Sequence, residues 1–196
     1  TYTVKTEDTV GNVSSKDFTI YKTDSSAPQV ESPLSYTDWT NTAKTITLII
    51  TDYGSGSPQT SLDNQTSYKS CTKTSDGKYQ ITYTFNDNIN RTKDHDLYLK
   101  DALGNAQKVV LTVGNIDKNK YTIAYNLNNG SIKGQKTSYT VVDSFTLPAP
   151  TRTGYTFTGW TGSNGKTAQK SVSIAKGTTG NKAYTANWTP ADYTIS

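Results

Sequence analysis

The sequence has few of the residues that usually carry enzyme chemistry or a disulfide framework. Its 196 residues include one cysteine (Cys71), one histidine (His95), no methionine and two glutamates, Glu7 and Glu31. A single cysteine excludes an intrachain disulfide, and with it the disulfide-rich design of many small secreted domains. There is no zinc-ligand spacing, phosphate-binding loop or nucleophile elbow. We therefore expect neither a catalytic residue nor a cofactor.

Long apolar runs are also missing. Only 32% of the residues are hydrophobic, and no run approaches the roughly 18 apolar residues that a transmembrane helix needs. The apolar residues instead alternate with polar ones, as in Ile46, Leu48 and Ile50, and 14 tyrosines add aromatic bulk. This period of two is typical of half-buried strands, and Thr and Tyr favour strands. The sequence predicts an all-β to mainly β fold, with a short helix possible only near Thr167–Ser171.

Two internal repeats indicate how the chain is divided. The motif Asp8–Asn12 (D-x-x-G-N) returns 93 residues later as Asp101–Asn105, each time between two strand patterns. The triplet Tyr121-Thr122-Ile123 returns as Tyr193-Thr194-Ile195. Short polar linkers lie between the repeated parts. We expect four segments: the C-terminal hairpin of a preceding repeat (1–26), a two-sheet sandwich (27–116), a second β-module (117–190), and the start of another copy (191–196).

The second module is expected to enclose a small aromatic core. Its alternating rows place Tyr155 and Trp188 inward. Trp160 follows Gly159 at an expected strand end, so we expect it to be partly exposed. It is then the candidate for stacking on a sugar ring.

Charge is distributed unevenly between the two parts. Residues 1–116 carry 11 basic and 13 acidic residues, a net charge of −2, whereas residues 117–190 carry nine basic and two acidic, a net charge of +7. A basic module favours acidic polymers such as teichoic acids or host glycosaminoglycans, although dispersed lysines also serve solubility. No nucleic-acid recognition motif is present. The candidate polyanion-binding residues are Lys118, Lys120, Lys133, Lys136, Arg152, Lys166, Lys170, Lys176 and Lys182.

Oxygen-rich loops make calcium the metal to consider. Asp87, Asp94 and Asp96 form the densest group in the sequence. A second group lies near the expected junctions between domains and consists of Asp24, Asp52, Asp101 and Asp117. Hard cations take several oxygen ligands, but no calcium-loop motif is present.

The residues around the D-x-x-G-N motif carry a family resemblance. The segments Asp38-Trp39-Thr40-Asn41, 46–56 and 98–105 are similar to the immunoglobulin-like repeats of bacterial surface proteins. This resemblance implies an immunoglobulin-like β-sandwich over 27–116.

The second module carries a more specific resemblance. The segments 121–130 (YTIAYNLNNG), 145–160 (FTLPAPTRTGYTFTGW) and 184–188 (YTANW) resemble the Listeria–Bacteroides repeat, also called the internalin-type B repeat. The resemblance implies a small β-grasp-like domain, tandem copies, and a place in adhesins and other secreted multidomain proteins. Some relatives are reported to bind glycosaminoglycans or host surfaces. Asn129 departs from the usual glycine, but asparagine also tolerates a positive φ.

These observations favour a stalk and interaction segment of an adhesin-like protein on a bacterial cell surface, in contact with neighbouring repeats of its own chain. Two alternatives remain open. One is polyanion binding by the basic module. The other is a carbohydrate-binding accessory module of a secreted enzyme.

Overall fold

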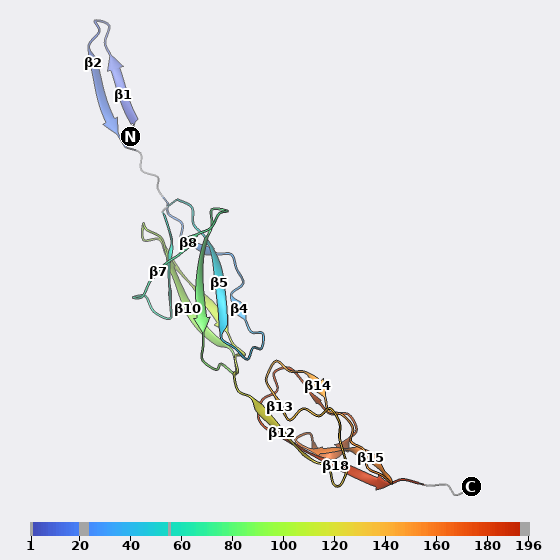
Figure 1. Cartoon of the computed structure of the whole chain (residues 1–196). Helices are drawn as coiled ribbons and strands as arrows, with labels where there is room; N and C mark the ends of the chain where they lie inside the picture. Colours follow the sequence, from blue (N-terminus) through green and yellow to red (C-terminus); the bar gives the residue numbers. More distant parts are fainter. Residues whose placement is uncertain (1, 20–23, 55, 193–196) are drawn as a thin grey trace. The chain divides into compact units, whose positions relative to one another are not determined.

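The computed structural model describes residues 2–19, 24–54 and 56–192, and these residues contain strands and no helix. The expected all-β fold is therefore confirmed (Figure 1). The chain divides into two compact units. The first comprises Thr1–Pro33, Thr47–Ile81 and Asp96–Val110, and the second comprises Leu34–Ile46, Thr82–His95 and Leu111–Ser196.

The first hairpin is held by its turn rather than by a core. Strands β1 (Tyr2–Glu7) and β2 (Val13–Phe18) pair antiparallel, and every residue of both strands is exposed. The Oδ1 atom of Asp8 accepts hydrogen bonds from the backbone N–H groups of Val10 (3.0 Å) and Asn12 (2.9 Å). Its Oδ2 atom accepts one from the Asn12 side-chain amide at 2.8 Å. One carboxylate thus satisfies three donors of the turn.

The second D-x-x-G-N motif forms the same turn. It follows β10 (Lys93–Lys100) and precedes β11 (Ala106–Val113), two neighbouring strands of one sheet. The Oδ1 atom of Asp101 accepts from the N–H groups of Leu103 and Asn105, both at 2.8 Å. Its Oδ2 atom accepts from the Asn105 amide at 2.7 Å. The sequence repeat is therefore a repeat of hydrogen-bonding geometry.

Two further sheets are built from the strands that span residues 29 to 113. One has the order β4-β11-β10-β6-β7 and the other the order β3-β5-β9-β8. Their remaining strands are β3 (Gln29–Val30), β4 (Ser35–Tyr36), β5 (Lys44–Thr51), β6 (Gln59–Leu62), β7 (Lys69–Ser70), β8 (Thr72–Lys73) and β9 (Tyr79–Phe85). The immunoglobulin-like connectivity stays a prediction.

The expected alternation decides which side chains are buried in these sheets. Ile46, Leu48 and Ile50 are buried on β5, and the residues between them are more exposed. Strand β9 buries every second residue, from Tyr79 to Phe85. The apolar rows read from the sequence are confirmed here, because a period of two places one set of side chains on one face.

Residues 121–190 form a mixed sheet with the order β13-β12-β18-β15-β16 and a separate pair, β14 and β17. The first strand, β12, runs parallel to the last, β18, which also pairs antiparallel with β15. The strands are β12 (Tyr121–Asn126), β13 (Ser138–Tyr139), β14 (Phe145–Thr146), β15 (Tyr155–Gly162), β16 (Gly165–Gln169), β17 (Ser173–Ile174) and β18 (Lys182–Pro190). The short helix expected near Thr167–Ser171 is wrong, because edge strand β16 occupies most of that segment. The β-grasp-like assignment stays a prediction.

Trp160 is the centre of this module, which corrects the sequence prediction. Its side chain is 0% exposed, and the rings of Phe157 and Tyr125 lie 5.3 and 5.6 Å from its ring. The register of β15 against β18 shifts between Phe157 and Gly159, so a β-bulge breaks the period of two. The bulge turns Trp160 to the buried side, whereas Tyr155, at the start of the strand, is 38% exposed.

Gly159 makes this bulge possible. Its φ is +142°, a conformation that side chains rarely adopt, and a Cβ atom there would lie 2.6 Å from the backbone of Gln169. Only glycine lets β16 approach this closely.

Replacing Trp160 by alanine should destabilise the module by about 3–5 kcal/mol, because it leaves a large cavity in a closed core. Urea unfolding followed by far-UV circular dichroism measures the change. Tyr155→Ala is the matched control at an exposed aromatic on the same strand and should cost less than about 1 kcal/mol. Equal costs for the two variants would contradict the assignment of Trp160 to the core.

Cys71, between β7 and β8, gives a second check on burial. It is 4% exposed, and desolvation raises the pKa of its thiol to about 11. The thiolate is the reactive form, so at about pH 8 the native thiol should react with a disulfide reagent at least about 100-fold more slowly than in the urea-unfolded chain. Similar rates in the native and unfolded chain would show that the site is open to solvent.

Candidate metal centre and other candidate sites

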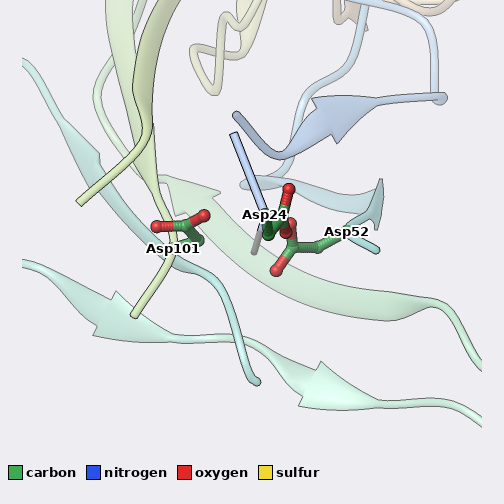
Figure 2. A group of neighbouring side chains, drawn as sticks. All are labelled: Asp24, Asp52 and Asp101. Atoms are coloured by element: carbon green, nitrogen blue, oxygen red, sulfur yellow. The ribbon is translucent and has the colours of Figure 1, made fainter. Parts of the chain in front are cut away.

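Three aspartates from distant parts of the sequence meet in the first unit. Asp24 precedes β3, Asp52 directly follows β5, and Asp101 directly follows β10 (Figure 2). One carboxylate oxygen from each lies within 4.8 Å of the other two. Among the residues that the structure describes, this is the one group of three or more acidic, histidine or cysteine ligands with such spacing. Three of the four aspartates expected near domain junctions are thus brought together.

The backbone around the cluster is fixed by the D-x-x-G-N turn. The Asn105 amide donates to the Asp101 carboxylate at 2.7 Å and to the backbone carbonyl of Asp24 at 2.8 Å. One asparagine therefore connects the turn to the linker. The Oδ1 atom of Asp24 accepts from the Ser26 N–H at 2.9 Å.

The other oxygen of Asp24 has a different environment. Its Oδ2 atom is buried and accepts no hydrogen bond. Asp101, whose carboxylate faces the same cluster, is only 4% exposed. Bringing carboxylates together away from water is unfavourable, unless a cation or a proton offsets their charge. The all-oxygen donor set fits a hard cation such as calcium.

Asp117 does not join this cluster. It is 0% exposed, and both of its carboxylate oxygens have donors. Oδ1 accepts from the Asn119 N–H at 2.9 Å, and Oδ2 accepts from the Tyr121 hydroxyl at 2.6 Å. Its role is to hold the start of β12.

The group expected at Asp87, Asp94 and Asp96 is not brought together as a ligand set in the described part of the chain. Asp87 is exposed, and Asp94 accepts a hydrogen bond from Thr112 at 2.7 Å. Asp96 forms an ion pair with Lys108 at 3.2 Å. Side chains of β11 therefore bind the two β10 carboxylates that sequence spacing suggested as metal ligands.

The basic side chains of the second module are dispersed. Of the nine candidates, only Lys136 forms an ion pair in the part that the structure describes, with Asp143 at 3.4 Å. Arg152 lies over the ring of Tyr155, 3.6 Å from its centre. Lys118 donates to the backbone carbonyl of Asn86. The other residues, all exposed or half-buried, are Lys120, Lys133, Lys166, Lys170, Lys176 and Lys182.

The accessible aromatic surface of the module is a groove, and Trp160 is not part of it. Arg152, Tyr155, Phe157 and Trp188 line it. The Trp188 indole N–H donates to the Leu127 carbonyl at 3.0 Å, which fixes the ring. Trp160 is buried and cannot stack on a ligand, so the expected sugar contact there is wrong. No motif signals this groove in the sequence, because its lining comes from three separate segments, 129–131, 150–157 and 188.

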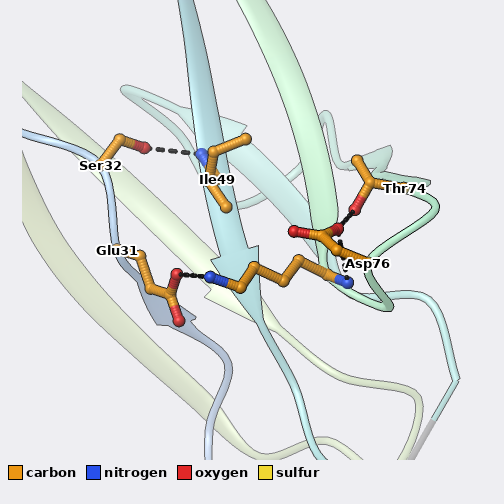
Figure 3. A network of polar contacts seen from close by, with 6 residues as sticks. Glu31, Ser32, Ile49, Thr74 and Asp76 are labelled. Carbon is orange, nitrogen blue, oxygen red and sulfur yellow. Dashed lines mark hydrogen bonds and ion pairs between the residues drawn. The ribbon is translucent and has the colours of Figure 1, made fainter.

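A polar network surrounds a shallow crevice near β5 (Figure 3). Lys78 pairs with Glu31 at 2.5 Å, and the Ile49 N–H donates to the Ser32 hydroxyl at 2.6 Å. The hydrogen bond to Glu31 raises the pKa of Lys78, and a hydrogen bond from Thr74 lowers the pKa of Asp76. Exposed pairs of this kind contribute little to stability.

The residue types that usually carry enzyme chemistry have structural surroundings here. His95 is 5% exposed, and its ring centre lies 5.0 Å from that of Phe85. Cys71 is buried, and Glu31 is held in its ion pair.

Comparison with known proteins identifies one part of the chain. Residues 121–189 match the family model of the Listeria-Bacteroides repeat domain, which supports the resemblance read from the sequence. No curated protein matches the chain. Within the described residues, no helix is long and apolar enough to cross a membrane. The segment from β12 to β18, which covers about a third of the chain, is thus similar to repeat domains that occur in bacterial surface or secreted proteins.

Proposed function

We propose that this chain is a repeat segment of an adhesin-like protein on a bacterial cell surface, where it acts as a stalk and interaction module without enzymatic activity. The match of residues 121–189 to the Listeria-Bacteroides repeat domain carries the proposal. That family suggests a repeat domain of bacterial surface proteins.

Repetition elsewhere in the chain supports a stalk. The turns at Asp8 and Asp101 share one hydrogen-bonding pattern, so the first part of the chain also contains a repeated structural unit. Repeated modules that each bury their own core add length without a large common core. Residues 121–190 meet this condition, since eight residues, Trp160 among them, form their buried cluster.

The chemistry of the described side chains agrees with a non-enzymatic role. His95 and Cys71 lie in the interior, and burial raises the pKa of Cys71 and so lowers its nucleophilicity near neutral pH. We place the protein outside the cell, on the bacterial surface or in the cell wall, with neighbouring repeats of the same chain as its first partners.

Antibodies raised against residues 1–196 test the location. Intact cells of the source organism should be labelled, and a protease added outside the cells should remove the label. Cells carrying a deletion of the gene are the control for specificity. Labelling that appears only after lysis would contradict the proposal.

A second candidate function is polyanion binding by the basic module. The observation that favours it is the shortage of acidic partners, because eight of the nine basic residues form no ion pair in the described structure. Unpaired cations attract polyanions, and such binding weakens as salt rises. The dispersed positions of the lysines favour the surface-repeat function as the main one.

A charge-reversal pair tests polyanion binding. Lys166 and Lys170 are exposed and lie on or beside edge strand β16. If the module binds polyanions, the full chain should be retained on heparin and on lipoteichoic acid, and the double change to glutamate should lower the eluting salt concentration. Changing Lys5 and Lys16 of the first hairpin alters the net charge equally and is the matched control. Equal effects of both pairs, or elution of the unchanged chain in low salt, would reject a specific site.

A further inference from the structure

We propose that the aromatic groove of the second module binds a sugar ring that carries a carboxylate. The lining of the groove comes from the segments 129–131 and 150–157 and from Trp188. Its volume is about 650 Å³, within the range of about 300–1,000 Å³ that is usual for small-ligand sites. Such sites combine aromatic walls with a few placed polar groups, and both are present here.

The aromatic wall is held in place by the protein itself. The Leu127 carbonyl accepts from the Trp188 indole N–H and from the Gly130 N–H, both at 3.0 Å. A Cβ atom on Gly130 would lie 2.5 Å from the Cζ2 atom of Trp188, so glycine lets this turn approach the ring closely. The Phe157 ring stands edge-on to that of Trp188, with their centres 5.5 Å apart. Rings that are already fixed lose little conformational freedom when a ligand binds.

Arg152 is the one charged side chain among the described residues that line the groove. Its guanidinium lies over the ring of Tyr155, 3.6 Å from the ring centre, and the Tyr155 N–H donates to the Arg152 carbonyl at 3.1 Å. Stacking uses the face of the guanidinium and leaves the N–H donors at its edge. In the described structure this side chain has no carboxylate partner. A carboxylate fits the planar fork through two parallel hydrogen bonds.

Neutral polar groups accompany the rings. Five lining residues carry a hydroxyl or an amide and are exposed: Asn129, Ser131, Thr151, Thr153 and Thr156. The hydroxyls of Ser131 and Thr151 lie 3.1 Å apart and share a hydrogen bond, which leaves acceptor capacity on both oxygens. Groups of this kind can donate to and accept from the hydroxyls of a sugar, and none of them repels an anion.

These three features together select the class of ligand. A sugar ring has C–H groups on its faces, which pack on aromatic rings, and hydroxyls around its edge. A carboxylate on the ring supplies a partner for Arg152. A quaternary ammonium ligand also suits aromatic rings, but the Arg152 cation repels it. A proline-rich peptide uses the rings and brings no carboxylate to Arg152. The assignment goes beyond the stalk role, because it places one ligand in one groove.

The test uses the full chain and two uronic acid probes that differ in ring stereochemistry, a tetragalacturonate and a hyaluronan tetrasaccharide. The chain has three tryptophans, so a proton–nitrogen correlation spectrum shows three indole signals. At least one probe should shift the Trp188 signal, identified with Trp188→Phe, until the groove is saturated. The methyl ester of that probe should bind at least about 10-fold more weakly, because the ester removes the charge. An unmoved Trp188 signal with both probes would overturn the proposal.

Arg152→Gln is the decisive variant. It removes the charge but keeps a long polar side chain at a half-buried surface position, so the module should stay folded. Its affinity for the probe should fall at least about 10-fold, and Arg152→Lys, which keeps the charge without the fork, should lie between the two. Tyr155→Ala removes an exposed ring and should weaken binding about 3-fold or more. The indole signal of the buried Trp160 reports whether each variant is folded.

Two matched controls should bind the probe as the unchanged chain does. Lys170→Gln removes one charge of the same module outside the groove, and Tyr53→Ala removes an exposed tyrosine of the first unit. Equal losses in Arg152→Gln and Lys170→Gln would overturn the site in favour of attraction by dispersed charges. Binding of an amidated decaproline peptide without binding of either uronate would overturn it in favour of a peptide groove. The result does not depend on cell-surface labelling, because it measures ligand binding alone.

Discussion

The described structure depends on the way one carboxylate satisfies several backbone donors at a hairpin turn. Only 32% of the residues are hydrophobic, so strand pairing cannot rely on burial everywhere. In the first hairpin nothing is buried, yet the register from Tyr2↔Phe18 to Glu7↔Val13 is regular. Asp8 fixes that register from the turn, and its hydrogen bonds lower its pKa below the ordinary value. The same device at Asp101 fixes the β10–β11 turn.

The second module relies on a different constraint, the burial of one tryptophan. Trp160 contacts the aromatic rings of Tyr125, Phe157 and Tyr184, and a two-residue strand irregularity turns it inward. Because protein interiors are close-packed, the two residues depend on each other: Gly159 allows the bulge, and the bulge lets Trp160 fill the core. The groove lined by Tyr155 and Trp188 lies in the same module.

The sequence predicted the features that depend on local chemistry. The alternating rows such as Ile46, Leu48 and Ile50 follow from the pleat, and the two D-x-x-G-N turns follow from their donors and acceptors. It failed at Trp160, because a bulge changes which face a residue occupies without leaving a composition signal. It also allowed a short helix near 167–171, where pairing with β15 imposes an extended backbone.

The candidate metal site shows a similar division. Sequence spacing favoured Asp87, Asp94 and Asp96, which lie close along the chain, whereas the structure assembles aspartates from a linker and two strand ends. Their proximity is a product of sheet order, which a local pattern does not contain. The sequence grouped Asp24, Asp52, Asp101 and Asp117 from their places near the expected domain junctions, and the structure brings the first three together but not Asp117.

The parallel pairing of β12 with β18 has a mechanical consequence. These are the first and last strands of the module, and they are direct neighbours from Ile123↔Lys182 to Asn126↔Thr185. A force that pulls the chain at both ends of the module is then directed along the two strands, in opposite senses. Their hydrogen bonds lie across that direction, so they must break together in shear and cannot open one after another. A module whose first and last strands pair in parallel resists extension far better than its modest core alone would suggest.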